Sequence, residues 1–196
     1  MIKLIAFVKS NFTLFLSAIV LILFFTGNLT GVTTLAQSAF LKTGMMDASA
    51  DSKVDAESFD FNFSVTDLRG NVVQINQYKG KVIFINLWAT WCGPCRAEMP
   101  TIQELYNTVD HDKIVFILLS LDKASDQNKV INFIKKKEFT FPVFLPASQL
   151  TEQLNVPSIP TTFVISKAGN IVSRDIGTTN FNTKKFKKFL QSEIDK

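Results

Sequence analysis

The chain has 196 residues, of which 46% are hydrophobic, 19 are phenylalanine and two are cysteine, and its formal net charge at pH 7 is +4. This length suffices for one ordinary domain plus an extension and argues against two full domains. The positive charge does not indicate nucleic-acid binding, because the lysines are scattered or lie on expected helix faces and no motif that reads RNA or DNA is present.

Residues 1–36 have the features of a targeting segment and are excluded from the expected fold. Two lysines precede an apolar stretch over residues 12–25, which only two weakly polar residues interrupt. A stretch of this length lies between a signal-peptide core and a membrane-spanning helix. The wider window 11–29 is long enough for a short or tilted span, so a membrane anchor is physically feasible.

Two outcomes are open for this segment, namely retention as a membrane anchor or removal by a signal peptidase. Small residues around Ala36 and Ser38 suit a peptidase, but they lie far beyond the apolar stretch, which favours the uncleaved anchor. Lysines precede the stretch and none follows before Lys42. The amino terminus is therefore expected on the cytoplasmic side of the membrane, and the remainder of the chain on the opposite side. The domain is therefore expected at the extracytoplasmic face of the bacterial inner membrane, or in the periplasm after cleavage.

Residues 37–57 mix Ala, Ser, Asp, Lys and Gly with little periodicity, which predicts a flexible linker. The folded domain is expected over residues 58–196. At its start, the alternation of apolar and polar residues over 59–65 predicts a half-buried strand. The turn residues 67–71 and the short apolar run 72–75 predict the second half of a hairpin.

The nearly continuous apolar run 81–88 predicts a strand that is buried on both faces. Apolar residues at helical spacing from Met99 to Tyr106 predict an amphipathic helix after it. The two cysteines, Cys92 and Cys95, therefore lie at a strand-to-helix junction. The unpaired N–H groups and the positive dipole end of a helix favour a thiolate, so a lowered cysteine pKa and chemical reactivity are expected there.

The remaining pattern is that of further strands and helices in alternation. A second buried strand over 113–122 makes the preceding helix the crossover of a parallel βαβ unit. The other expected elements are a helix from Ser125 or Asp126 to about Lys137, a strand over 141–145, a brief helix over 148–154, strands over 159–165 and 171–174, and a closing amphipathic helix over 183–194.

The number and spacing of the cysteines limit their chemistry. Zinc and iron–sulfur sites normally take about four ligand side chains, and the chain has two cysteines and His111, so no metal is expected. Attachment of c-type haem requires histidine directly after the second cysteine, where this chain has Arg96. A static disulfide would close a loop too short to constrain the unfolded chain much. Thiol–disulfide exchange is therefore the favoured function of the two cysteines. No cofactor is expected beyond the redox-active pair itself.

Residues 88–100, WATWCGPCRAEMP, resemble the active site of the thioredoxin superfamily and more closely its TlpA/ResA branch. Members of this branch are extracytoplasmic, commonly membrane-tethered thiol–disulfide oxidoreductases. The resemblance covers residues 59–190 and includes the later segment 158–162, SIPTT. It implies a thioredoxin-like α/β fold: a central mixed β-sheet flanked by helices, an amino-terminal β-hairpin, and a strand and helix inserted within residues 123–155.

The resemblance also implies catalytic roles. Cys92 is expected to attack a substrate disulfide, and Cys95, one turn further in, to resolve the mixed disulfide. Glu98 shares the helix face of Cys95 and is a candidate proton carrier, because a glutamate here is associated with tuning the thiols in this branch. An exposed helix glutamate without such a role is the alternative. Asn86 stands where thioredoxin has a buried aspartate, and an amide cannot relay a proton as a carboxylate does.

Substrate contacts are implied on two sides of the cysteine pair. Superfamily members hold a cis-proline opposite the CxxC motif, and its backbone pairs with an incoming substrate strand. Both the Gly-Pro dipeptide and the isoleucine before the proline resemble reducing members of the superfamily. Trp88 is expected in the core. The residues expected to bind substrate are Trp91, Gly93, Pro94, Ile159 and Pro160.

The predicted function is an extracytoplasmic thiol–disulfide oxidoreductase that mainly reduces protein disulfides, with apocytochrome c among the candidate substrates. A membrane thiol-transfer protein is expected as its electron donor, since a reductant outside the cytoplasm must be recharged. Two alternatives are a disulfide-forming oxidase and a thiol peroxidase of the peroxiredoxin kind. The peroxiredoxin signature places threonine three positions before its reactive cysteine, whereas Thr90 is two positions before Cys92.

Overall fold

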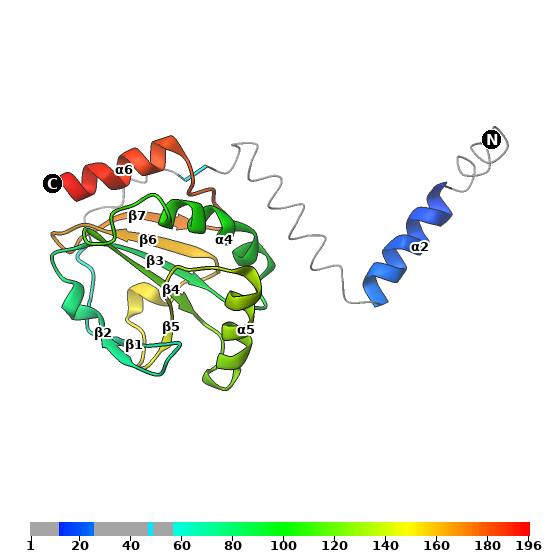
Figure 1. Cartoon of the computed structure of the whole chain (residues 1–196), viewed down its shortest axis with the longest axis horizontal. Coiled ribbons are helices and arrows are strands. Elements are labelled where there is room, and N and C mark those ends of the chain that lie inside the picture. Colours follow the sequence, from blue (N-terminus) through cyan, green and yellow to red (C-terminus); the bar gives the residue numbers. More distant parts are fainter. Residues whose placement is uncertain (1–11, 26–46, 49–56) are drawn as a thin grey trace.

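The computed structural model describes residues 12–25, 47–48 and 57–196. Its centre is a seven-stranded sheet with the order β2-β1-β5-β4-β3-β6-β7 (Figure 1). The strands are β1 (Ser64–Asp67), β2 (Val72–Gln74), β3 (Val82–Trp88), β4 (Ile114–Ser120), β5 (Val143–Pro146), β6 (Thr161–Ile165) and β7 (Ile171–Ile176). The helices of the domain are α4 (Gly93–Tyr106), α5 (Gln127–Lys137) and α6 (Lys184–Asp195), with 3-10 turns η1 (Ile75–Tyr78), η2 (Ala124–Asp126) and η3 (Glu152–Leu154).

Strand β3 lies inside the sheet between β4 and β6, and all seven of its residues are buried. It pairs in parallel with β4 and antiparallel with β6. Beyond these neighbours, β5 is parallel to β4, while β1, β2 and β7 add antiparallel pairs at the two edges. The sheet is therefore mixed and contains the predicted β3-α4-β4 crossover, which confirms the expected fold class.

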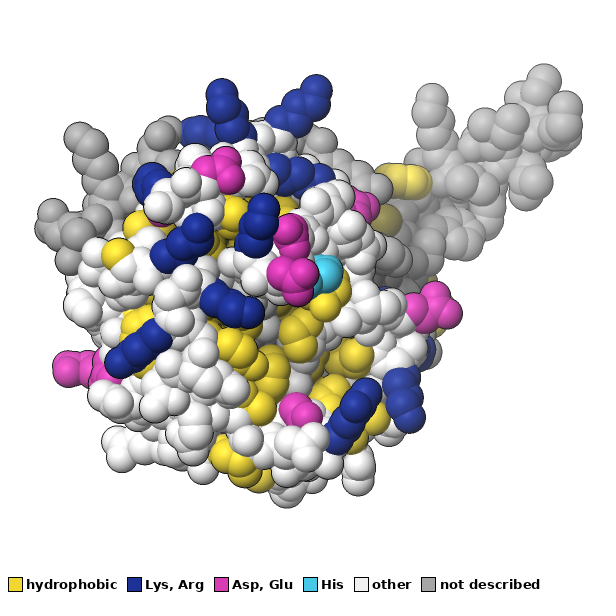
Figure 2. Space-filling view, turned by 60° about the vertical axis from the view of Figure 1, so that its left-hand side comes forward, with side chains coloured by type: hydrophobic (Ala, Val, Ile, Leu, Met, Phe, Trp, Pro, Cys, Tyr) yellow, Lys and Arg dark blue, Asp and Glu magenta, His cyan; other side chains and the backbone are white. Residues whose placement is uncertain are grey.

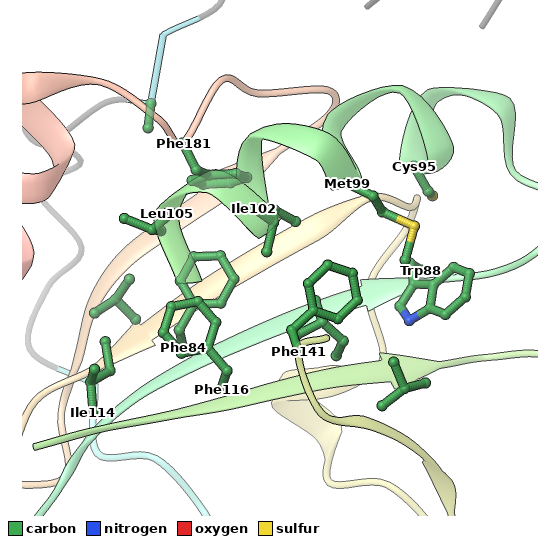
Figure 3. Close-up of a cluster of buried hydrophobic side chains, with 14 of the residues drawn as sticks. Phe84, Trp88, Cys95, Met99, Ile102, Leu105, Ile114, Phe116, Phe141 and Phe181 are labelled. Carbon is green, nitrogen blue, oxygen red and sulfur yellow. The ribbon is translucent and has the colours of Figure 1, made fainter. Parts of the chain in front are cut away.

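The two faces of the sheet carry separate apolar clusters, because successive side chains of a strand point to opposite faces. Phe84 and Trp88 face the side covered by α4, α5 and α6. Ile102 of α4 points onto the strands from above, and Cys95 lies at the start of the same helix (Figure 3). The opposite cluster is closed by the segment 57–63 and the turns η1 and η3. Each large apolar side chain buried in this way stabilises the fold by about 1.5–3 kcal/mol.

The strand predicted over residues 59–65 forms only at its end. Phenylalanines 59, 61 and 63 are buried and the intervening polar residues are exposed, as the alternation predicts. The backbone nevertheless enters β1 only at Ser64, because the N–H groups of Asn62 and Phe63 make local bonds to Asp60 and Phe61. The prediction was wrong over 59–63, since alternation reports which side chains are buried and not which strand the backbone pairs with.

Two other elements differ in detail from the expectation. The brief helix expected over 148–154 is the single 3-10 turn η3. Asp126 stands at the start of α5 without capping it through its side chain, which forms an ion pair with Lys129 at 2.8 Å instead. The end of the domain is as predicted: Thr183 caps α6 by accepting a hydrogen bond from the backbone N–H of Phe186.

Helix α2 (Phe12–Phe25) coincides with the apolar stretch near the amino terminus. Among the residues that the structure describes, no helix is both long and apolar enough to cross a membrane. Residues 11 and 26–29 of the wider window and most of the linker 37–57 lie outside the described residues. The membrane anchor, the alternative cleavage and the flexible linker therefore stay predictions.

The surface carries charges of both signs. On the face shown in Figure 2, Lys and Arg side chains are spread out, with Asp and Glu side chains between them. His111 is exposed in the turn before β4, as expected, and its ring lies 4.1 Å from that of Tyr106.

Candidate active site

Cys92 and Cys95 lie where the chain passes from β3 into α4, as predicted, and they are joined in a disulfide with their Cα atoms 5.3 Å apart. Cys92 is the N-cap residue of α4, and the backbone N–H of Cys95 donates to its Sγ at 3.2 Å. Pro94 occupies the first turn, where a missing N–H leaves no helical bond unmade. After reduction, this N–H group and the helix dipole would stabilise a thiolate on Cys92.

The two cysteines differ in access to solvent. Cys95 is fully buried and Cys92 is 5% exposed, so a substrate reaches Cys92 first. Trp91, directly before Cys92, is 70% exposed and presents a large apolar surface beside the disulfide. Trp88 is fully buried, as expected for a core residue. This arrangement suits attack by Cys92 on a polypeptide that rests on the Trp91 ring.

The Ile159–Pro160 segment faces the disulfide from the start of β6. The peptide bond between the two residues is cis, as the family resemblance implied. The carbonyl oxygen of Ile159 lies 3.8 Å from Sγ of Cys92, and the carbonyl oxygen of Pro160 accepts a hydrogen bond from Gly177 at 2.9 Å. The structure thus brings the predicted substrate-binding residues together around the more accessible cysteine.

Glu98 is fully buried, which excludes the alternative of an exposed helix glutamate. Its carboxylate accepts hydrogen bonds from Nδ2 of Asn86 at 2.8 Å and from the backbone N–H of Thr179 at 3.0 Å. Burial raises the pKa of Glu98 to about 8, and the charge of Asp175 adds to the rise, while the two hydrogen bonds act in the opposite direction. Glu98 can therefore bind or release a proton near neutral pH.

Asn86 joins Glu98 to the neighbouring strand. Its Nδ2 donates both to Glu98 and to Oγ1 of Thr162 on β6, at 2.9 Å. Its Oδ1 is buried and has no hydrogen-bond partner among the described residues. A buried polar atom left unpaired costs about 1–3 kcal/mol. Through Nδ2, the Asn86 amide links the Glu98 carboxylate to β6.

Asp122 is a site residue that the sequence reasoning missed, since it was treated only as the end of a strand. Its carboxylate accepts bonds from the Thr90 backbone N–H at 2.8 Å, the Thr90 hydroxyl at 2.6 Å and the Ser120 hydroxyl at 2.7 Å. It thereby fixes the segment that leads into Cys92. Its place at the carboxyl end of a parallel strand, where the sites of α/β sheets gather, was an available signal.

Comparison with known proteins identifies the family. A profile of the AhpC/TSA family matches residues 58–174. A thiol-disulfide oxidoreductase ResA of Bacillus cereus is 38% identical over 117 residues, which are 59% of this chain and 66% of that protein. Another ResA, from Bacillus thuringiensis subsp. konkukian, is 34% identical over 140 residues, 71% of this chain and 75% of that protein.

Solved structures agree with this assignment. The crystal structure of StoA from Bacillus subtilis has a TM-score of 0.54 and 27% sequence identity, and the superposition covers 65% of this chain and 94% of StoA. The chain therefore belongs to the AhpC/TSA family of thioredoxin-like proteins, among thiol–disulfide oxidoreductases of the ResA type.

Proposed function

We propose that this thiol–disulfide oxidoreductase acts mainly as a reductant of protein disulfides outside the cytoplasm. The observation that carries the proposal is the pair of unequally accessible cysteines at the start of α4, with a buried carboxyl that titrates near neutral pH on the same helix. The Gly-Pro dipeptide between the cysteines and Ile159 before the proline support the reducing direction, since both resemble reducing superfamily members.

The reaction conserves electrons and protons. The Cys92 thiolate attacks one sulfur of a substrate disulfide, forms a mixed disulfide and expels the other substrate sulfur as a thiolate. Cys95 then gives its proton to the ionised form of the Glu98 carboxyl and attacks Sγ of Cys92, which releases the second substrate thiolate. The two substrate thiolates take up two protons, which replace the proton that Cys92 lost to solvent on ionisation and the proton that Glu98 passes on from Cys95. The protein ends with the Cys92–Cys95 disulfide, and the substrate has gained two electrons and two protons.

The proposed setting follows from the amino-terminal segment. We place the domain outside the cytoplasmic membrane, tethered by the apolar stretch around α2, or in the periplasm if that segment is removed. The proposed donor is a membrane thiol-transfer protein, and apocytochrome c is a candidate among the protein substrates. Labelling of the reduced cysteines in intact cells by a membrane-impermeant maleimide tests the location, because a cytoplasmic domain would stay unlabelled.

A thiol peroxidase is the second candidate, since the AhpC/TSA profile matches the domain. The structure gives it less support. Thr90 is two positions before Cys92, and its hydroxyl donates to Oδ1 of Asp122. Consumption of hydrogen peroxide by the reduced protein, at a rate comparable to its disulfide exchange, would favour this candidate over the reductant.

The direct test of the proposed chemistry is to trap its intermediate. The full-length Cys95→Ser variant keeps the attacking thiol but lacks the resolving one, so we expect it to accumulate a mixed disulfide with a disulfide-bonded peptide. The matched Cys92→Ser variant should trap far less, because the remaining thiol is fully buried. Equal trapping by both variants would contradict the assignment of Cys92 as the nucleophile.

A further inference from the structure

The connection between β7 and α6, residues 177–183, contacts three parts of the redox site. Its backbone N–H groups donate in turn to the carbonyl oxygen of Pro160, to Oε2 of Glu98 and to Oγ1 of Thr101 in α4. The donors are Gly177 at 2.9 Å, Thr179 at 3.0 Å and Phe181 at 3.2 Å. The position of this connection therefore determines how well the Glu98 carboxylate is hydrogen-bonded.

An amino-terminal segment holds the same connection from the other side. The backbone N–H of Ala48 donates to the carbonyl oxygen of Asn180 at 3.1 Å, and Nδ2 of Asn180 donates to Oδ1 of Asp47 at 3.1 Å. These contacts form a short parallel bridge, and Figure 1 shows the segment beside the chain that leads into α6. Asn180 directly follows Thr179, the backbone donor to Glu98.

Burial adds to these hydrogen bonds. Ala48 is 2% exposed and belongs to the apolar cluster that contains Phe181 and Cys95. A larger or charged side chain at position 48 would have to leave this cluster, because buried interiors have little free volume. The segment is thus fixed by its side chain as well as by its backbone, although it precedes the domain boundary expected at residue 58.

We propose that Asp47 and Ala48 are positioning residues of the redox site: they hold the 177–183 connection so that the N–H group of Thr179 stays directed at Glu98. The inference rests on the proposed role of Glu98 as a proton carrier. It extends the site to a part of the chain that lies between the predicted membrane anchor and the catalytic domain. A fragment that begins at residue 57 lacks these contacts.

The expected consequence is a change in proton affinity. A hydrogen bond donated to a carboxylate stabilises its charged form, so weakening the Thr179 bond raises the pKa of Glu98 further. The charge of Asp175 on β7 also acts on Glu98, and it stays in place when position 47 or 48 changes. The cysteines do not titrate in the disulfide form. Titration of the oxidised protein therefore reports Glu98 without interference from the thiols.

The test follows the carboxyl carbon of Glu98 by NMR in the oxidised, full-length protein labelled with carbon-13 glutamate, and Glu98→Gln identifies the signal. We expect Asp47→Ala and Ala48→Leu to raise the titration midpoint by about half a pH unit or more. The conservative variants Asp47→Asn, which keeps an oxygen acceptor, and Ala48→Gly should leave the midpoint near the wild-type value.

An unchanged midpoint in Asp47→Ala would overturn the proposal, and this variant decides the question even if Ala48→Leu fails to fold. Equal shifts in Asp47→Asn and Asp47→Ala would also overturn it, because the shift would then not depend on the acceptor oxygen that asparagine keeps. The role of Glu98 is tested separately. If Glu98→Gln leaves the pH profile of disulfide exchange unchanged, the proton-carrier role fails, while the NMR midpoint still tests the positioning residues.

Discussion

Two buried carboxylates flank the segment that carries the disulfide, and they are bonded in different ways. Asp122, at the end of β4, accepts two hydrogen bonds from Thr90 and one from the hydroxyl of Ser120. Glu98, in α4, accepts one bond from the amide of Asn86 and one from the backbone of the 177–183 connection. Asp122 thus holds the chain that leads into Cys92, whereas Glu98 shares the helix and the buried surroundings of Cys95.

The difference shows that environment, and not residue type, assigns the role of a buried carboxyl. Asp122 receives its donors largely from the segment that it fixes, so it works as a clamp. Glu98 is fully buried and accepts hydrogen bonds from Asn86 and Thr179, and burial outweighs these bonds and raises its pKa to about 8. This is the property that the proposed role of Glu98 as a proton carrier requires. Loss of a clamp should lower stability alike at every pH, whereas loss of a proton carrier should have an effect that depends on pH.

The largest expected effect is that of Asp122→Ala. This change leaves the N–H and hydroxyl of Thr90 and the hydroxyl of Ser120 without their acceptor, so we expect a loss of about 3–5 kcal/mol in the free energy of unfolding. Urea unfolding at pH 6 and pH 8 measures it, and the loss should be the same at both. Asp122→Asn, which keeps one acceptor oxygen, should lose less; a strongly pH-dependent loss would contradict the clamp.

Glu98→Gln should remove part of the pH dependence of stability. The folded-state pKa of Glu98, about 8, lies above the ordinary value of 4.5, so its protonated form stabilises the fold below about pH 4.5. Above pH 4.5, Glu98 is ionised in the unfolded chain but still protonated in the folded protein. This contribution to the free energy of unfolding is therefore lost as the pH rises to about 8. Relative to the variant, the wild type should lose about 2–4 kcal/mol between pH 5 and pH 8. Parallel stability curves for the two proteins would contradict the raised pKa.

Asn86→Leu should shift the same pH dependence. The substitution removes the Nδ2 donor to Glu98 while keeping a side chain of similar size, so the pKa of Glu98 should rise by about one unit. The stability that depends on Glu98 is the difference between a protein and its Glu98→Gln version. In the Asn86→Leu protein this difference should be lost at a higher pH than in the wild type. If the Asn86→Leu protein lost this contribution at the same pH as the wild type, the Asn86 amide would not stabilise the charged carboxylate of Glu98.

Thr162→Val should have the smallest effect. It removes the Oγ1 acceptor of the second Asn86 bond and keeps the shape of the side chain, so we expect a loss of about 1 kcal/mol at every pH. Chemical unfolding at two pH values measures this loss. A stability change above 3 kcal/mol would show that Thr162 takes part in holding more than the orientation of Asn86.

Sequence reasoning was successful where the signal is local. The length and continuity of the apolar run predicted β3, and the position of the cysteines between that strand and a helix predicted their place at the start of α4. Spacing along the helix also placed Glu98 on the same side as Cys95. The alternation over 59–65 predicted the buried phenylalanines but not the pairing, because a burial pattern carries no information about the partner strand.

The missed residues are those whose partners are distant in the sequence. Asp122 acts on Thr90 across 32 positions, and Thr179 donates to Glu98 across 81. No periodicity or spacing rule spans such separations, because these contacts arise only when the sheet brings β4 and the end of β7 beside α4. The full burial of Glu98 belongs to the same class, since it depends on the 177–183 connection that covers the carboxylate.

The central claim is that this protein donates electrons to protein disulfides. The measurement that tests it most directly is the reduction potential of the Cys92–Cys95 couple in the full-length protein, equilibrated with glutathione or dithiothreitol buffers. A potential near or below about −250 mV, in the range of thioredoxin, is the predicted result. A potential near about −120 mV, as in DsbA, would contradict the claim and identify a protein that forms disulfides instead.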